Sequence, residues 1–120
     1  MSIGRAMMAT TEAEREMWVG IETCKMAASR QMVCQVSGQI LDTRTVVVLE
    51  LAHAGHTSMV ALHGDAWDKA EAGMRKSCEE KGVTLTVTDG RALETARKAH
   101  ERAKRAERAR LKAESETPRP

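Results

Sequence analysis

Along the chain, the spacing of hydrophobic and polar positions changes several times, and each change predicts a new element. Between residues 12 and 31, small or apolar residues recur every three or four positions, as on one face of a helix. Thr11 and Glu14 form a capping-box pattern, which marks a helix start. The pattern predicts a helix over residues 12–31, in which Gly20 is a tolerated weak point.

Two apolar stretches that follow have the composition of strands. RTVVVLEL, residues 44–51, contains three consecutive Val residues, whose stiff side chains favour extended backbone. TSMVALH, residues 57–63, is the second stretch, and the intervening AHAGH, residues 52–56, is typical of a loop. Together they predict an antiparallel hairpin.

Beyond the hairpin, the sequence predicts a helix, a strand and a last helix. Asp65 is placed to cap AWDKAEAGMRKSCEEK, and Gly82 stands where a left-handed C-terminal cap belongs. VTLTVTDG, residues 83–90, alternates apolar residues with Thr and ends in an Asp-Gly turn, the pattern of a half-buried strand. A strongly charged helix is expected over residues 92–113.

This order, α-β-β-α-β-α, predicts an α+β fold. We expect a small antiparallel or mixed sheet with its helices packed on one side. Residues 1–90 would form a single α+β domain, residues 91–114 a basic, Ala-rich helix, and residues 115–120 a disordered tail.

The composition limits the core of this fold. Among 120 residues there is no Phe or Tyr, and Trp18 and Trp67 are the only two Trp residues. Eight Met residues and many Ala residues must therefore fill the interior, and Met specifies shape poorly. We expect either a modest, plastic core or a homodimer that shares core surface between chains.

The chain lacks the marks of a membrane or exported protein. No stretch approaches the roughly 20 apolar residues of a membrane helix, and the N-terminus lacks the layout of a signal peptide. Cys24, Cys34 and Cys78 are odd in number and widely spaced, which argues against a disulfide framework. We expect a cytoplasmic protein with reduced, buried thiols.

Cys34-Gln-Val-Ser-Gly resembles the first half of a zinc knuckle, with Ser37 in place of the second Cys. Structural zinc takes four Cys or His ligands, usually as two pairs, and beyond the hairpin His63 and Ala66 stand at the spacing of the second pair. Residues 34–82 thus resemble a treble-clef zinc module in which two of four ligand positions are changed. The resemblance implies a module that has lost its zinc and persists on hydrophobic packing.

An alternative zinc site would join Cys34 and His63 to a histidine of the hairpin loop, if that loop folds back. The candidate metal ligands are then Cys34, His53, His56 and His63. We nevertheless expect no metal and no other cofactor. We also expect no enzyme, because Cys34 and a neighbouring His come without a nucleophile elbow, a phosphate-binding Gly loop or paired carboxylates.

Charge is unevenly distributed along the chain. Residues 1–90 hold nine Lys and Arg against twelve Asp and Glu, a net charge of −3, whereas residues 91–112 hold nine against three, a net charge of +6. Such asymmetry points to an anionic partner. The expected phosphate-binding residues are Arg97, Lys98, Arg102, Lys104, Arg105, Arg108, Arg110 and Lys112.

Three interpretations of this basic helix compete. It is a solvated extension stabilised by the ion pairs Glu94–Lys98 and Glu101–Arg105, or it lies along nucleic-acid phosphates, a salt-dependent contact that ignores base sequence. In the third, a stripe of alanines with heptad spacing packs on the first helix or on a second copy. That stripe consists of Ala92, Ala96, Ala99, Ala103 and Ala106.

The sequence favours a small binding module that contacts nucleic-acid phosphates through this helix. Base specificity is not expected, because the helix has no aromatic, Asn or Gln side chain to stack on or read a base. A membrane partner is not expected either, since the helix lacks a bulky apolar face. The alternative is a homodimer or protein-binding adaptor that uses its amphipathic helices.

Overall fold

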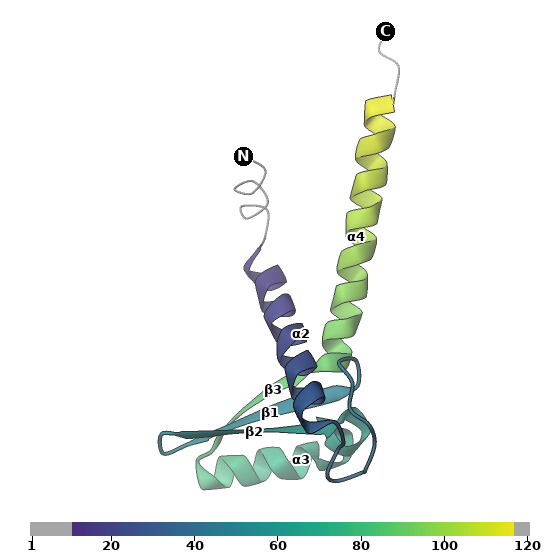
Figure 1. Cartoon of the computed structure of the whole chain (residues 1–120). Coiled ribbons are helices and arrows are strands. Elements are labelled where there is room, and N and C mark those ends of the chain that lie inside the picture. The colour runs from purple at the N-terminus through teal and green to yellow at the C-terminus, as the bar shows by residue number, and fades with distance from the viewer. Residues whose placement is uncertain (1–10, 117–120) are drawn as a thin grey trace.

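The computed structural model describes residues 11–116, which form three helices and a three-stranded sheet (Figure 1). The sheet is antiparallel, with strand order β2-β1-β3. The predicted α+β class and element order are confirmed. The elements are α2 (Glu12–Gln31), β1 (Val46–His53), β2 (His56–His63), α3 (Gly64–Lys81), β3 (Thr84–Asp89) and α4 (Gly90–Glu116).

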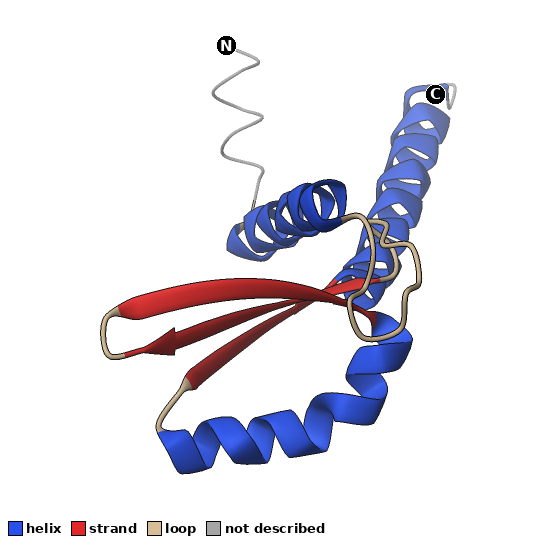
Figure 2. Cartoon of the chain, turned by 60° about the horizontal axis from the view of Figure 1, so that its bottom comes forward, coloured by secondary structure: helices blue, strands red, loops and turns tan. Residues whose placement is uncertain are grey.

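The sheet separates α2 from α3, which lie on opposite faces (Figure 2). Side chains alternate along β1, so Val46 and Val48 face α2 while Val47 and Leu49 face α3, and all four are fully buried. The prediction that the helices pack on one side is therefore wrong. A run of four consecutive apolar residues, without alternation, is typical of a strand covered on both faces.

The hairpin is tighter than predicted. β1 continues to His53 and β2 begins at His56, so most of the predicted loop 52–56 belongs to the strands. Only Ala54 and Gly55 form the turn, and their φ angles are 49° and 80°. Positive φ at both central residues is the requirement of a type I′ turn, whose twist matches that of the two strands.

The Gln31 side chain forms hydrogen bonds with the backbone at the outer edge of β2. Nε2 of Gln31, at the end of α2, donates to the Ala61 carbonyl at 2.6 Å, and the Ala61 N–H donates to Oε1 at 3.0 Å. The amide thus pairs both outward backbone groups of Ala61, as a neighbouring strand would. Each bond contributes about 1 kcal/mol, and the pair blocks addition of another strand at this position.

α4 follows β3 without the predicted Asp-Gly turn. The Asp89 carboxylate accepts the N–H of Arg91 at 2.9 Å, and the helix begins at Gly90, two residues earlier than expected. The Arg91 guanidinium also bonds Asp89 and makes two bonds, of 2.8 and 2.9 Å, to Asp68 of α3. Partial burial opposes ionisation of Asp89, but Arg91 holds the pKa of this carboxyl below its usual range. These contacts fix the base of α4 to the sheet and to α3.

The far end of α4 also differs from the prediction. The helix continues through Glu116, two residues into the segment 115–120 that is predicted to be a tail. The remainder of that segment, 117–120, lies outside the described residues.

Candidate functional site

Residues 33–40 form a tight turn beside the sheet. Val33 and Ile40 make an isolated β-bridge, and the Gly38 N–H donates to the Cys34 carbonyl at 2.7 Å. Gly38 has a φ of 75°, a conformation that glycine adopts without steric cost. The turn folds the chain so that successive N–H groups point back at the Cys34 side chain.

The Cys34 thiol is fully buried and surrounded by donors. Burial alone would raise its pKa, but hydrogen bonds from the Ser37 hydroxyl and from the backbone N–H groups of His63, Ser37 and Val36 lower the pKa to about 7. The bond from His63 places the start of α3 directly against the turn. The structure therefore places the backbone of one candidate ligand, His63, beside the thiol of another, Cys34.

The residues around Cys34 do not fit a zinc ion. The hydroxyl of Ser37 is a poor ligand for zinc, and the side chain of Ala66 has no atom that can coordinate a metal ion. The His63 Nδ1 accepts the Asp65 N–H at 3.1 Å, so His63, and not the predicted Asp65, is the N-cap of α3. Within residues 11–116, no group of three or more His, Cys, Asp or Glu side chains is arranged to hold a metal.

The alternative zinc site is not assembled either. His53 pairs with His56 beside the hairpin turn, whereas His63 pairs with Val46 at the opposite end of the strands. Seven residue steps along the extended strand, about 23 Å, separate His56 from His63. The hairpin loop does not fold back, so neither of its histidines reaches Cys34 and His63.

The first turns of α4 pack on α2. A Cβ added to Gly20 would lie 2.8 Å from Leu93 Cδ1, so the absence of a side chain at Gly20 is what lets Leu93 approach. About two helical turns further along α4, the His100 ring meets the Trp18 ring edge-on, with centroids 6.1 Å apart. The sequence signal for this contact is Gly20, which the helix pattern alone marks only as a weak point.

The alanine stripe of α4 does not make this contact. It lies roughly a quarter of a turn around the helix from Leu93 and His100. The interpretation that the stripe packs on the first helix is therefore wrong. Its members are all exposed: Ala92, Ala96, Ala99, Ala103 and Ala106.

Two of the predicted phosphate-binding residues are paired within α4. Arg97 bonds Glu94 at 2.7 Å and Glu101 at 2.6 Å, and Arg110 bonds Glu114 at 2.9 Å. Arg97 lies between the two carboxylates and forms a salt bridge with each of them. The predicted salt bridges Glu94–Lys98 and Glu101–Arg105 are consequently absent from the described part of the chain.

Four other cations lie along one side of α4, and we call them the basic stripe. Its members are Lys98, Arg102, Arg105 and Lys112. Their 4-3-7 spacing places them on one side of the helix over about 21 Å. All four are exposed, and none forms a salt bridge with another residue of the range 11–116.

The remaining two predicted residues lie beside the basic stripe. Helical spacing turns Lys104 and Arg108 away from its centre, and the Arg108 Nε donates to the Lys104 carbonyl at 3.4 Å. From Arg102 to Glu116 every residue is exposed, and this part of α4 projects away from the sheet (Figure 1). The basic stripe is thus open to a partner over most of its length.

No known protein family, curated protein or solved structure matches the chain. Its three cysteines are all free and buried. Among residues 11–116, no helix has the length and apolar character needed to cross a membrane.

Proposed function

We propose that the protein is a non-enzymatic module that binds nucleic-acid phosphates through the basic stripe of α4, without base specificity. The observation that carries this proposal is the gathering of four exposed cations on one side of a projecting helix, none of them in a salt bridge within residues 11–116. Such cations release condensed counterions when they meet phosphates, which is the main driving force of non-specific binding.

The dimensions of the basic stripe suit this partner. Four charges over about 21 Å average one per about 7 Å. Duplex DNA carries one negative charge per about 1.7 Å of its axis, so phosphates are denser than the cations of the stripe and each cation can meet one. The body, residues 1–90, has a net charge of −3, which directs the contact toward α4.

The experiment replaces Lys98, Arg102, Arg105 and Lys112 together by Gln and measures affinity for a mixed-sequence DNA duplex by fluorescence anisotropy. Loss of four phosphate contacts should weaken binding on the order of a hundredfold at about 100 mM salt. Gln is a good helix former, so circular dichroism should show an intact α4.

A matched control removes the same charge from the body. It replaces four exposed cations outside α4, namely Lys25, Arg44, Lys69 and Lys76, by Gln. This variant should keep the affinity within about threefold, because long-range charge effects are screened by salt. Equal losses of affinity in the two variants would contradict a specific role for the basic stripe, because net charge alone would then account for the binding.

A second candidate function is self-association or protein binding through the alanine stripe. It is favoured by the exposure of all five alanines, which α2 leaves uncovered. Small side chains let a second helix approach closely. Ala99→Glu with Ala103→Glu should then reduce the sedimenting mass from dimer to monomer, independently of salt, whereas the DNA-binding function predicts no change.

For the turn at residues 33–40 and the elements up to Gly82, we propose a treble-clef-like module without zinc. Contacts between the Cys34 thiol and the His63 N–H support it, because they bring the turn and the start of α3 together. Free, buried thiols at all three cysteines support a reducing compartment, and we propose a cytoplasmic location.

A further inference from the structure

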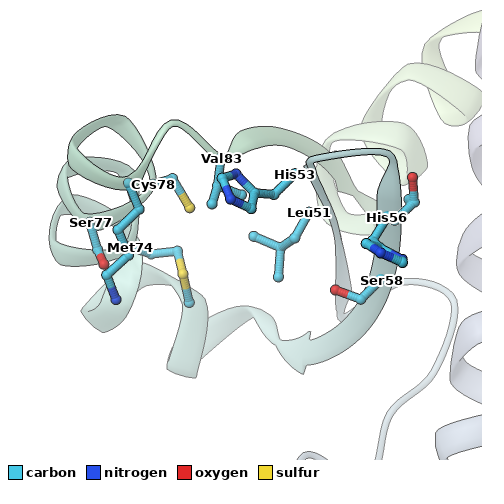
Figure 3. A pocket seen from close by; sticks show the side chains of 10 residues that line it. Leu51, His53, His56, Ser58, Met74, Ser77, Cys78 and Val83 are labelled. Carbon is cyan, nitrogen blue, oxygen red and sulfur yellow. The ribbon is translucent and has the colours of Figure 1, made fainter.

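A pocket opens between the hairpin end of the sheet and the C-terminal half of α3, on the face opposite α2 (Figure 3). Its volume is about 430 Å³, within the range of sites for small ligands. The other end of the same layer is filled by Trp67, which is only 2% exposed. No side chain of that size stands at the hairpin end, and the space stays open.

The interior of the pocket is apolar. Leu51 of β1 and Met74 of α3 face each other across it, with Cys78 and Val83 beside them (Figure 3). Met is a flexible side chain that adapts to ligands of different shape. The remaining lining residues are polar or charged: His53, His56, Thr57, Ser58, Ser77 and Lys81.

The charge at the rim of the pocket favours the binding of an anion. Lys81 lines it, whereas no carboxylate of the described residues does. The C-terminus of a helix, here α3, ordinarily repels anions, but the Cys78 and Glu79 carbonyls at this end accept the Gly82 N–H. His53 Nδ1 lies 3.3 Å from the Gly82 carbonyl. Two of the carbonyl groups at this helix end are thus already paired, and Lys81 is the one ammonium group among the residues that line the pocket.

We propose that this pocket binds a small amphiphilic anion, with its apolar part between Leu51 and Met74 and its acidic head group beside Lys81. The site is distinct from the basic stripe of α4 and does not depend on nucleic-acid binding. Its chemistry is that of a medium-chain carboxylate.

The test uses decanoate and the full chain with ¹³C-labelled Met methyl groups. Titration should shift the Met74 resonance, assigned with Met74→Leu, in a saturable manner. Lys81→Gln should weaken binding about threefold, the effect of losing one exposed charge contact. Lys76→Gln, on the same helix but outside the pocket, is the matched control and should bind decanoate as the wild type does.

Ser58→Phe provides a second test, because an aromatic side chain on β2 would fill the mouth of the pocket while suiting an exposed strand position. We expect it to abolish the shift of Met74. A Met74 resonance that does not move, or equal affinities of the Lys81→Gln and Lys76→Gln variants, would overturn the proposal. A shift that persists in Ser58→Phe would overturn it as well.

Discussion

Replacing Gly90 by Ala is expected to lower the free energy of unfolding by about 3–5 kcal/mol. Gly90 is buried at the junction of β3 and α4, and a Cβ there would collide with the Thr43 carbonyl oxygen and lie 2.8 Å from that of Val46. Both are backbone atoms of the segment that leads into β1, so no rotamer change relieves the contact. Urea unfolding followed by circular dichroism measures the effect.

Gly73→Ala is the control for this substitution. Gly73 lies inside α3, is exposed, and has no atom within 4 Å of the added Cβ. Because Ala is the better helix former, this variant should gain about 0.5–1 kcal/mol. A Gly90→Ala protein as stable as the wild type would show that the start of α4 does not pack against residues 43–46 as described.

The double substitution Ser37→Cys with Ala66→Cys is expected to create a zinc site between the turn at residues 33–40 and the start of α3. The two new thiols would join Cys34 and His63 in a Cys₃His set, which is a common structural zinc site. Such sites bind zinc with on the order of 10 kcal/mol. Metal content by mass spectrometry, on protein purified without a His tag, should rise to one zinc per chain.

Two variants sharpen this prediction. Ser37→Cys with Ala70→Cys adds the same number of thiols but places the second one a helical turn further along α3, and it should not retain zinc. Adding Cys34→Ser to the original pair should remove one ligand and release the metal. If the folded double variant takes up no more zinc than the wild type, the relation to treble-clef modules is contradicted.

Local rules predicted most of the elements. Thr11 accepts the Glu14 N–H at 3.1 Å, as its capping pattern requires. Gly82 has the left-handed conformation of a C-terminal cap, with a φ of 67°. The alternation of Leu85 and Val87 with Thr residues predicted β3. These features depend only on neighbours in the sequence, which is why the sequence alone reveals them.

The arrangement of the elements depends on contacts between distant residues and was predicted less well. Heptad spacing identified an alanine stripe on α4 but not which face of the helix meets α2. That choice is made by Leu93, the one large aliphatic residue in the first turns of α4, which packs where Gly20 leaves space. A glycine within a helical pattern is therefore a better indicator of helix contact here than the stripe.

The candidate site was also predicted only in part. The sequence identified the cations of α4, but Arg97 and Arg110 differ from the others only through their bonds to carboxylates of the same helix. Which of several neighbouring cations takes a given carboxylate depends on side-chain geometry. The pocket beside Leu51 and Met74 had no sequence signal, because it arises from β1 and α3 together.

The most direct test of the proposed function is the salt dependence of DNA binding by the full chain. Affinity for a mixed-sequence duplex would be measured by anisotropy between about 50 and 200 mM NaCl. Four phosphate contacts predict a slope of log K against log salt near −4, and a fall in affinity of about a hundredfold over this range. Absence of binding at the lowest salt, or binding that salt leaves unchanged, would contradict the proposal.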